Sequence, residues 1–224
     1  MIKGVILDFN GTLYRDHDLN DRAWMETFYI VAGEDSKDRY EDFDVSTETL
    51  NKDHDYSKAI LNRFNKDDSE EEILKLSKYK EDLYMKYAKE ANRKQLMEGA
   101  EEFLNYLIKN NIPYCIASMA PLWNFNFYLD YLHLDKWFTF DNIVYDTVEY
   151  PNKNLMYQEA ARRMNINIED ALLFEDSPKV IKKAPLSGVN KIIYLNSKNK
   201  ELSMPKIIQE IKDFRDFDYS ILEK

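Results

Sequence analysis

The sequence predicts an α/β protein built on a parallel sheet with helices on both faces, interrupted by one helical insertion. The chain has 224 residues, enough for one α/β domain and a small insertion. Short apolar runs alternate with segments of helical spacing over most of that length, and strands that alternate with helices form parallel sheets. One long stretch near the N-terminus breaks this alternation and predicts helices only.

The predicted strands are short apolar runs bounded by polar or turn residues, as expected of strands buried on both faces. Four are clear and a fifth, at 142–145, is weaker; the clear ones are 5–7, 114–117, 171–174 and 192–195. Apolar residues at helical spacing predict helices between and after them, at 100–108, 127–132, 155–164 and 207–211.

The insertion is assigned to residues 19–94, and the core to residues 1–18 and 95–224. Three glutamates follow Ser69, where acidic residues favour a helix start, and apolar residues from Ile73 to Ala91 then share one helix face. The segment from Glu34 to Asp55 has no clear period and is interpreted as an acidic linker. His54, inside that segment, is expected to be a solvated loop residue and not a metal ligand.

Composition excludes several functions. With 31 Lys and Arg against 41 Asp and Glu, the net charge is −10, so binding to nucleic acid is not expected. The five glycines are too dispersed for a dinucleotide loop or a Walker loop. The single cysteine, Cys115, cannot form an internal disulfide, and no secretory or membrane-spanning segment is evident. A cytoplasmic protein, monomeric or homodimeric, is expected.

Acidic and hydroxyl side chains follow three of the predicted strands. The first strand is followed by Asp8, the second by Ser118, and the third by Glu175 and Asp176. Ligands of open parallel sheets lie at the carboxyl ends of the strands, so these side chains are expected to converge. Clustered carboxylates are costly unless a cation lies between them, and Mg²⁺ accepts carboxylates together with phosphate oxygens. A carboxylate can also attack phosphorus directly, in which case a hydroxyl and a lysine are needed to hold the transferring oxygens; Ser118 and Lys153 are available.

These segments together resemble the haloacid dehalogenase superfamily, in its phosphatase-like members with a helical cap inserted after the first strand. Residues 8–13 (Asp-Phe-Asn-Gly-Thr-Leu) resemble the first motif of that family, 116–118 the second, and 174–178 the fourth. The resemblance covers nearly the whole chain and implies a Rossmann-like core, with residues 19–94 forming the cap.

The resemblance also implies residue roles. Asp8 is similar to the family's nucleophile, which forms an aspartyl-phosphate, Thr12 supports its loop, and Ser118 is similar to the phosphate-binding hydroxyl. Asp8, the carbonyl of Asn10 and Asp176 would ligate Mg²⁺, with Glu175 nearby.

Lys153 is matched less closely to the family pattern. Relatives place the phosphate-binding lysine just before a proline, about six positions ahead of the residue matched by Tyr157, and here Pro151 occupies that place. Lys153 lies two residues further on and is the candidate for binding phosphate and contacting Asp8.

Asn10 departs from the phosphatase pattern, which has a second aspartate at this position. An amide can donate a hydrogen bond to a leaving oxygen but cannot exchange a proton with it or with water. Loss of such acid–base catalysis costs about 10²- to 10⁴-fold in rate. Substrates whose leaving group needs no proton would be least affected, unless His17, Glu175 or a cap residue supplies the base.

The sequence therefore predicts a Mg²⁺-dependent hydrolase of small phosphorylated metabolites. The alternatives are a weak or silent phosphate-binding protein of the same fold and a phosphotransferase that acts like a mutase. Relatives that act on haloacids or phosphonates also lack the second aspartate. The pair Glu175–Asp176 disfavours a metal-free dehalogenase, and no lysine of residues 19–94 is assigned to a Schiff base.

Overall fold

The computed structural model describes residues 1–33, 36–43, 52–147, 149–197, 199 and 201–223. The chain divides into two compact units: residues 1–15 with 94–224, here called the core unit, and residues 16–93, here called the insertion unit.

A parallel sheet of six strands, counted within the described residues, forms the centre of the core unit, in the order β3-β2-β1-β4-β5-β6. The strands are β1 (Gly4–Leu7), β2 (Tyr114–Pro121), β3 (Ile143–Asp146), β4 (Ala171–Glu175), β5 (Lys191–Leu195) and β6 (Ile207–Ile211). All five predicted strands, including the weaker one, are confirmed.

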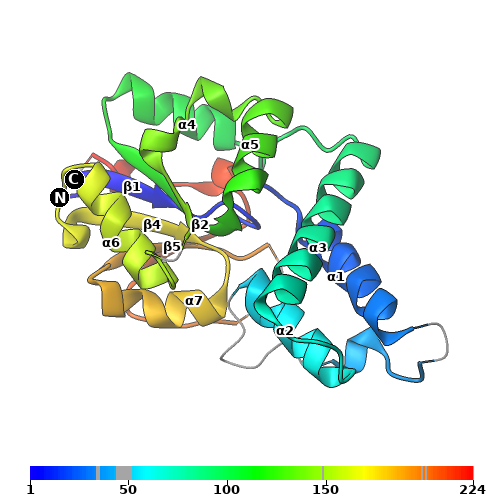
Figure 1. Cartoon of the computed structure of the whole chain (residues 1–224). Coiled ribbons are helices and arrows are strands. Elements are labelled where there is room, and N and C mark those ends of the chain that lie inside the picture. Colours follow the sequence, from blue (N-terminus) through cyan, green and yellow to red (C-terminus); the bar gives the residue numbers. More distant parts are fainter. Residues whose placement is uncertain (34–35, 44–51, 148, 198, 200, 224) are drawn as a thin grey trace. The chain divides into compact units, whose positions relative to one another are not determined.

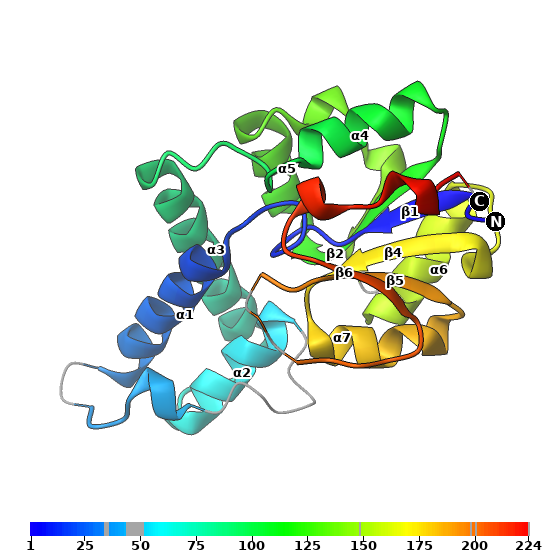
Figure 2. The ribbon, with the colours of Figure 1, turned by 180° about the vertical axis from the view of Figure 1, so that it is seen from behind.

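Helices cover both faces of this sheet, as Figures 1 and 2 show: α4 and α5 lie on one face, and α6 and α7 on the other. Their bounds are α4 Ala100–Lys109, α5 Leu122–Tyr131, α6 Lys153–Arg163 and α7 Pro178–Lys183. The predicted α/β class with a Rossmann-like parallel sheet is confirmed.

The two faces of the sheet have different cores. On the α6 and α7 side, Ile6 and Leu173 pack in one fully buried cluster with Met156 and Ile181. On the other side the core is aromatic, and the ring of Phe103 in α4 packs at a tilt against that of Phe174 in β4, with the ring centroids 4.9 Å apart. Because the strands are buried on both faces, their sequences are continuous apolar runs.

The helix predicted at 207–211 is wrong, because these residues form the edge strand β6. Apolar residues four positions apart, Ile207 and Ile211, fit a period of 2 as well as one of 3.6. Burial alternates along β6, with Ile208 and Glu210 exposed, and β-branched isoleucines favour a strand once β5 offers a partner.

The insertion unit is helical, with α1 (His17–Ala32), α2 (Asp53–Arg63) and α3 (Glu70–Glu90). The predicted helix start after Ser69 is confirmed. Its core is apolar, and Trp24 and Phe28 of α1 pack against Ile60 of α2 and Ile73 of α3.

The predicted linker from Glu34 to Asp55 lies partly outside the described residues, at 34–35 and 44–51. At its end the prediction is wrong, because residues 53–55 form the first turn of α2. Acidic side chains are favourable there, next to the unpaired backbone N–H groups, and Asp55 accepts a hydrogen bond from the Lys52 N–H at 3.3 Å. His54 is therefore helical, with its Nε2 3.0 Å from Glu70 Oε2.

Candidate active site

The loop that follows β1 places Asp8 at the carboxyl edge of the sheet. The Asp8 N–H donates to the carbonyl of Phe174 in β4 at 3.0 Å, which continues the pairing of β1 with β4 by one residue. The chain then turns back at Gly11, whose φ of 81° lies in the left-handed region that glycine adopts without steric cost. Thr12, fully buried, donates from Oγ1 to Asp8 Oδ2 at 3.2 Å.

Lys153, the first residue of α6, brings its ammonium group to Asp8. Its Nζ donates to Asp8 Oδ1, to the Ala117 carbonyl at 2.8 Å and to Glu175 Oε2 at 3.4 Å. Asn152 caps the helix by accepting a hydrogen bond from the Leu155 N–H at 3.2 Å. The helix start two residues after Pro151 thus places Lys153 at the sheet edge.

The charge of Lys153 is stabilised by its surroundings. Burial alone would lower its pKa, but the carboxylates of Asp8 and Glu175 outweigh burial and raise the pKa above its usual value. The side chain is therefore an ammonium at neutral pH.

Three carboxylates meet at this edge. Oxygen atoms of Asp8, Glu175 and Asp176 all lie within 4.8 Å of one another. Burial, and secondly the charge of Glu175, raise the pKa of Asp8 to about 6, although Lys153 opposes the shift. Burial is also the main cause that raises the pKa of Glu175. With one ammonium against three carboxylates, the cluster favours binding of a further cation.

The oxygens of Glu175 have protein donors of their own. Oε1 accepts from the Ser177 N–H at 3.2 Å, and Oε2 accepts from the Tyr157 hydroxyl at 2.8 Å as well as from Lys153. These contacts fix the carboxylate, so Glu175 is suited to support Lys153 and Asp176 more than to be an open ligand.

The set of donor atoms fits a magnesium ion. Mg²⁺ binds carboxylate, carbonyl and water oxygens, and protein sites usually contribute only one or two carboxylates. Asp8 and Asp176 offer such carboxylates from the ends of two adjacent strands, and the acidic cluster is the observation that supports a cation here.

The sequence predicted that Ser118 follows the second strand, but the residue lies within β2. The strand continues to Pro121, with a shift of register against β3 between Ala117 and Pro121. The side chain is 2% exposed. Its Oγ donates to Asn10 Oδ1 at 3.5 Å, and the Asn10 amide donates from Nδ2 to Tyr128 Oη at 3.0 Å.

The structure thus brings together all seven residues predicted for the site: Asp8, Asn10, Thr12, Ser118, Lys153, Glu175 and Asp176. Sequence reasoning missed the roles of two tyrosines, Tyr157 beside Glu175 and Tyr128 beside Asn10. The chain has sixteen tyrosines, and no local pattern separates these two from those that only pack.

His17, considered from the sequence as an alternative base, is the first residue of α1 in the insertion unit. That unit also contains a buried lysine, Lys80, whose ammonium donates to Glu81 at 2.6 Å and to Asp53 at 3.3 Å. Burial would lower the pKa of Lys80, but the two carboxylates outweigh burial and raise the pKa above its usual value. A Schiff base requires a neutral amine, so these contacts disfavour that chemistry.

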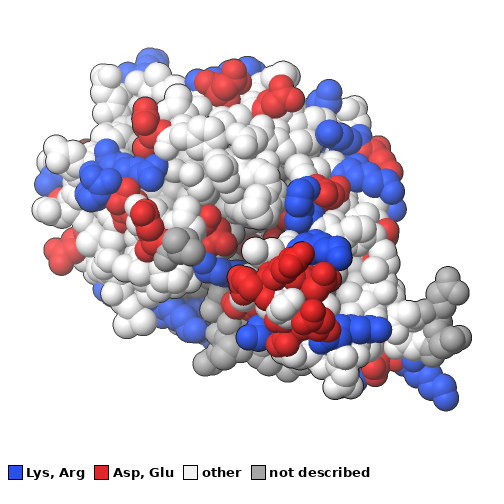
Figure 3. Space-filling view, viewed as in Figure 1, with Lys and Arg blue, Asp and Glu red and all other residues white. Residues whose placement is uncertain are grey.

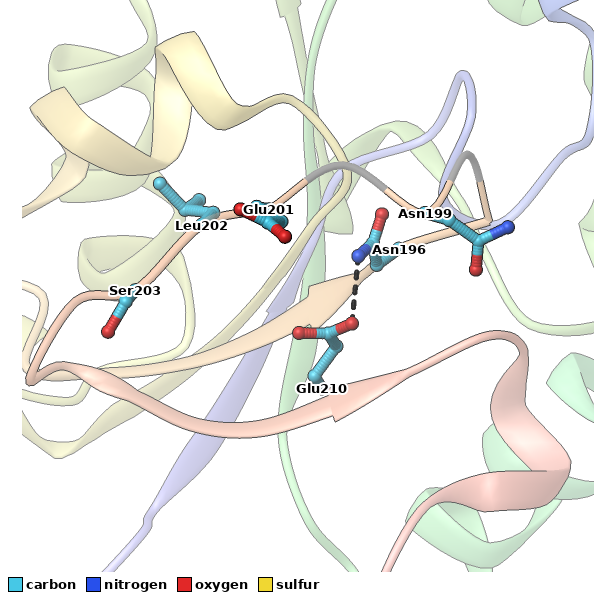
Figure 4. A pocket seen from close by; sticks show the side chains of 6 residues that line it. All are labelled: Asn196, Asn199, Glu201, Leu202, Ser203 and Glu210. Atoms are coloured by element: carbon cyan, nitrogen blue, oxygen red, sulfur yellow. Dashed lines mark hydrogen bonds between the residues drawn. The ribbon is translucent and has the colours of Figure 1, made fainter.

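A hollow of about 650 Å³ lies beside the ends of β5 and β6 (Figure 4). Asn196 donates from Nδ2 to Glu210 Oε1 at 2.8 Å across it. Tyr194, one residue before the end of β5, pairs in register with Glu175 on one side and Glu210 on the other, so strand β5 separates Glu210 of the hollow from Glu175 along the sheet. Its lining combines two glutamates, Glu201 and Glu210, with polar side chains and Leu202.

The charges on the surface are mixed. On the face shown in Figure 3, basic and acidic side chains are interspersed, and the densest group is acidic. Among the described residues, no helix combines the length and apolar character needed to cross a membrane.

The core unit is thus a parallel α/β sheet with a cluster of carboxylates at the carboxyl ends of its strands. A family model described as haloacid dehalogenase-like hydrolase matches residues 2–184. The chain belongs to this family, as the sequence motifs predicted. The comparison with curated proteins finds no match.

Several solved structures share this fold. A hydrolase of family IA, variant 3, from Entamoeba histolytica HM-1:IMSS is 26% identical over 98% of this chain and 96% of its own, with a TM-score of 0.84. A mutant of CbbY from Rhodobacter sphaeroides in complex with xylulose-(1,5)bisphosphate is 20% identical over 96% of each chain, with a TM-score of 0.76. The β-phosphoglucomutase of Clostridium difficile is 19% identical over 100% of this chain and 96% of its own, also with a TM-score of 0.76.

Proposed function

We propose that this hydrolase is a Mg²⁺-dependent phosphatase that acts through an aspartyl-phosphate on Asp8. The observation that carries the proposal is the meeting of Asp8, Glu175 and Asp176 within 4.8 Å, with the Lys153 ammonium on Asp8. Mg²⁺ held by Asp8, Asp176 and the carbonyl of Asn10 would neutralise charge on the phosphoryl oxygens.

The contacts of the protein groups support the following proposed roles. Asp8 attacks phosphorus, the bond from phosphorus to the leaving oxygen breaks, and the leaving group takes the electron pair. Lys153 and Ser118 hold the transferring oxygens, and Thr12 keeps the Asp8 carboxylate in place. Water then attacks phosphorus and releases Asp8, and the proton of that water passes to solvent.

Asn10 limits this reaction, because its amide cannot protonate the leaving oxygen. Substrates with an acidic leaving group, such as acyl phosphates or activated aryl esters, should therefore be cleaved much faster than alkyl phosphates. Hydrolysis of the aspartyl-phosphate should then be the slow step, since water lacks a base at residue 10.

The proposed substrate is a small phosphorylated metabolite. The net charge of −10 opposes polyanions, and the insertion unit would act as the cap that selects the substrate and excludes water. Mutase-like and bisphosphate-bound relatives of the same fold are consistent with phosphorylated sugars as one class to test.

The first test is release of phosphate from acetyl phosphate and p-nitrophenyl phosphate in the presence of Mg²⁺. Release should be lost on chelation and in the Asp8→Asn variant, and acetyl phosphate should be the better substrate. Metal-independent release, or release that survives Asp8→Asn, would contradict the proposal.

A phosphate-binding protein without turnover is the second candidate, because the Asn10 amide is already engaged by Tyr128. This alternative predicts Mg²⁺-dependent binding of phosphate, no release from either compound, and no gain from Asn10→Asp. A large gain from Asn10→Asp would support the phosphatase. Phosphate that appears on an added sugar and not in solution would instead identify a phosphotransferase.

A further inference from the structure

The Tyr128 hydroxyl is hydrogen-bonded to Asn10, one of the residues of the candidate site. Tyr128 is fully buried in α5, and its ring lies 4.4 Å, centroid to centroid, from Phe9. Its oxygen accepts hydrogen bonds from Asn10 Nδ2 at 3.0 Å and from Asn124 Nδ2 at 3.4 Å. A buried phenol with two amide donors holds a fixed position, since moving it would leave polar groups unsatisfied.

The Asn10 amide connects this phenol to Ser118. Nδ2 of Asn10 is bound by Tyr128, and its Oδ1 lies 3.5 Å from Ser118 Oγ. On its other side Ser118 Oγ accepts from the Ala120 N–H at 3.2 Å. The serine oxygen is thus held between a backbone donor and an amide whose own orientation depends on Tyr128.

We propose that Tyr128 is a positioning residue for phosphate binding, which fixes the Asn10 amide and through it the orientation of Ser118. This inference rests on the proposed function and adds to it. The proposed role requires both ends of the Asn10 amide, because Nδ2 donates to the Tyr128 hydroxyl and Oδ1 accepts from Ser118. A carboxylate at this position has no hydrogen-bond donor for the Tyr128 oxygen.

The test removes the hydroxyl and keeps the ring. In Tyr128→Phe the packing against Phe9 is retained, but Asn10 Nδ2 loses its hydrogen bond to the Tyr128 hydroxyl. One neutral hydrogen bond corresponds to about a three- to tenfold change. Affinity for inorganic phosphate with Mg²⁺, measured by calorimetry, and kcat/KM for acetyl phosphate should both fall by that factor.

Tyr114→Phe is the matched control. Tyr114 begins β2, so it lies at the opposite end of the strand from the site residues, and its hydroxyl donates to the Trp137 carbonyl at 2.7 Å. Both substitutions delete one bonded hydroxyl from the core unit, so a general loss of stability would appear in both. Only Tyr128→Phe should weaken phosphate binding.

A double-mutant cycle separates positioning from packing. If Tyr128 acts through Asn10, Asn10→Ala should lower phosphate affinity as Tyr128→Phe does, and adding Tyr128→Phe to Asn10→Ala should have no further effect. Additive losses, or equal phosphate affinity in Tyr128→Phe and Tyr114→Phe, would overturn the inference. If Tyr128→Phe does not fold, unchanged phosphate affinity in Asn10→Ala alone would overturn it.

The two proposals can fail separately. A wild-type protein that neither releases nor binds phosphate with Mg²⁺ contradicts the proposed function and this inference with it. A wild-type protein that binds phosphate, with variants that bind it equally well, contradicts only the role of Tyr128.

Discussion

Each unit of the chain buries one lysine between two carboxylates. In the core unit, Lys153 contacts Asp8 and Glu175, and its side chain is 13% exposed. In the insertion unit, Lys80 contacts Asp53 and Glu81, and its side chain is 3% exposed. By residue type the two clusters are nearly the same, yet their surroundings differ.

The difference lies in the charge that is left over. Around Lys80, one ammonium faces two carboxyl groups, and burial raises the pKa of Asp53 well above its usual value despite the lysine. The ammonium also lies 4.8 Å from the centre of the Trp24 ring, which adds a cation–π contact. Around Lys153 a third carboxylate, Asp176, adds negative charge at the end of a strand. A buried lysine–carboxylate cluster indicates function when its charge is uncompensated and it lies where ligands bind.

The largest effect should come from Lys80→Met. Removal of the ammonium leaves two buried carboxyl groups without their partner, which should lower the free energy of unfolding by about 3–5 kcal/mol. Urea unfolding monitored by circular dichroism measures the change. Lys78→Met, which removes an exposed lysine from an i,i+4 pair with Asp82, is the control and should cost less than about 0.5 kcal/mol. Equal losses in both variants would contradict a structural role for Lys80.

Lys153→Met should have the opposite profile. Because the ammonium is proposed to hold the transferring phosphoryl group, its loss should reduce kcat/KM for acetyl phosphate by about 10²- to 10³-fold. Three carboxylates would then remain without their cation, so added Mg²⁺ should stabilise this variant against heat more than it stabilises the wild type. Activity within about threefold of wild type would remove Lys153 from the site.

Sequence reasoning succeeded where a single local pattern carries the information. Asp8 and Glu175 follow or end runs that are buried on both faces, and parallel strands bring such ends to one edge whatever else the chain does. The prediction failed at 207–211, because two apolar residues four positions apart fit the period of a helix as well as that of a strand. Only the pairing with β5 makes this segment a strand. The contact of Tyr128 with Asn10 could not be predicted from the sequence for a different reason. It depends on how α5 packs against the loop after β1.

Lys153 is intermediate between residues that a local pattern places and residues that only tertiary packing places. The sequence placed Pro151 where relatives have the lysine, and the position of Lys153 beside Asp8 depends on where α6 begins. The Asn152 cap fixes that start, because its side chain accepts from the Leu155 N–H. Helix caps are therefore a better guide to this lysine than distance from the proline.

A carboxylate paired with two arginines in the core unit should have a smaller effect on stability than the buried lysine Lys80. In α6, Glu159 accepts from Arg162 Nε at 2.6 Å and from Arg163 Nε at 2.8 Å, and the bond from Arg162 is the main cause that lowers the pKa of Glu159 to about 2. A carboxylate with a lowered pKa stabilises the fold fully above its unfolded value of 4.5 and loses that contribution as pH falls toward about 2. Glu159→Gln should lower the free energy of unfolding by about 1–2 kcal/mol at neutral pH.

The pH dependence provides the control for Glu159. The difference between wild type and Glu159→Gln, measured by urea unfolding, should shrink as pH falls below 4.5. A difference that is constant through this range would mean that the variant acts through packing and not through charge.

The smallest effect should come from a pair of neutral groups buried beside Lys80. Ser57 of α2 and Ser77 of α3 are hydrogen-bonded through their hydroxyls at 2.8 Å, and Ser77 also donates to the Ile73 carbonyl at 2.9 Å. Ser77→Ala removes one partner and should lower the free energy of unfolding by about 1 kcal/mol. Ser57→Ala combined with Ser77→Ala should cost less than the sum of the single changes, because no hydroxyl is then left without its partner. If instead the losses add, the two hydroxyls do not stabilise the unit as a pair, and the hydrogen bond between Ser57 and Ser77 makes no net contribution.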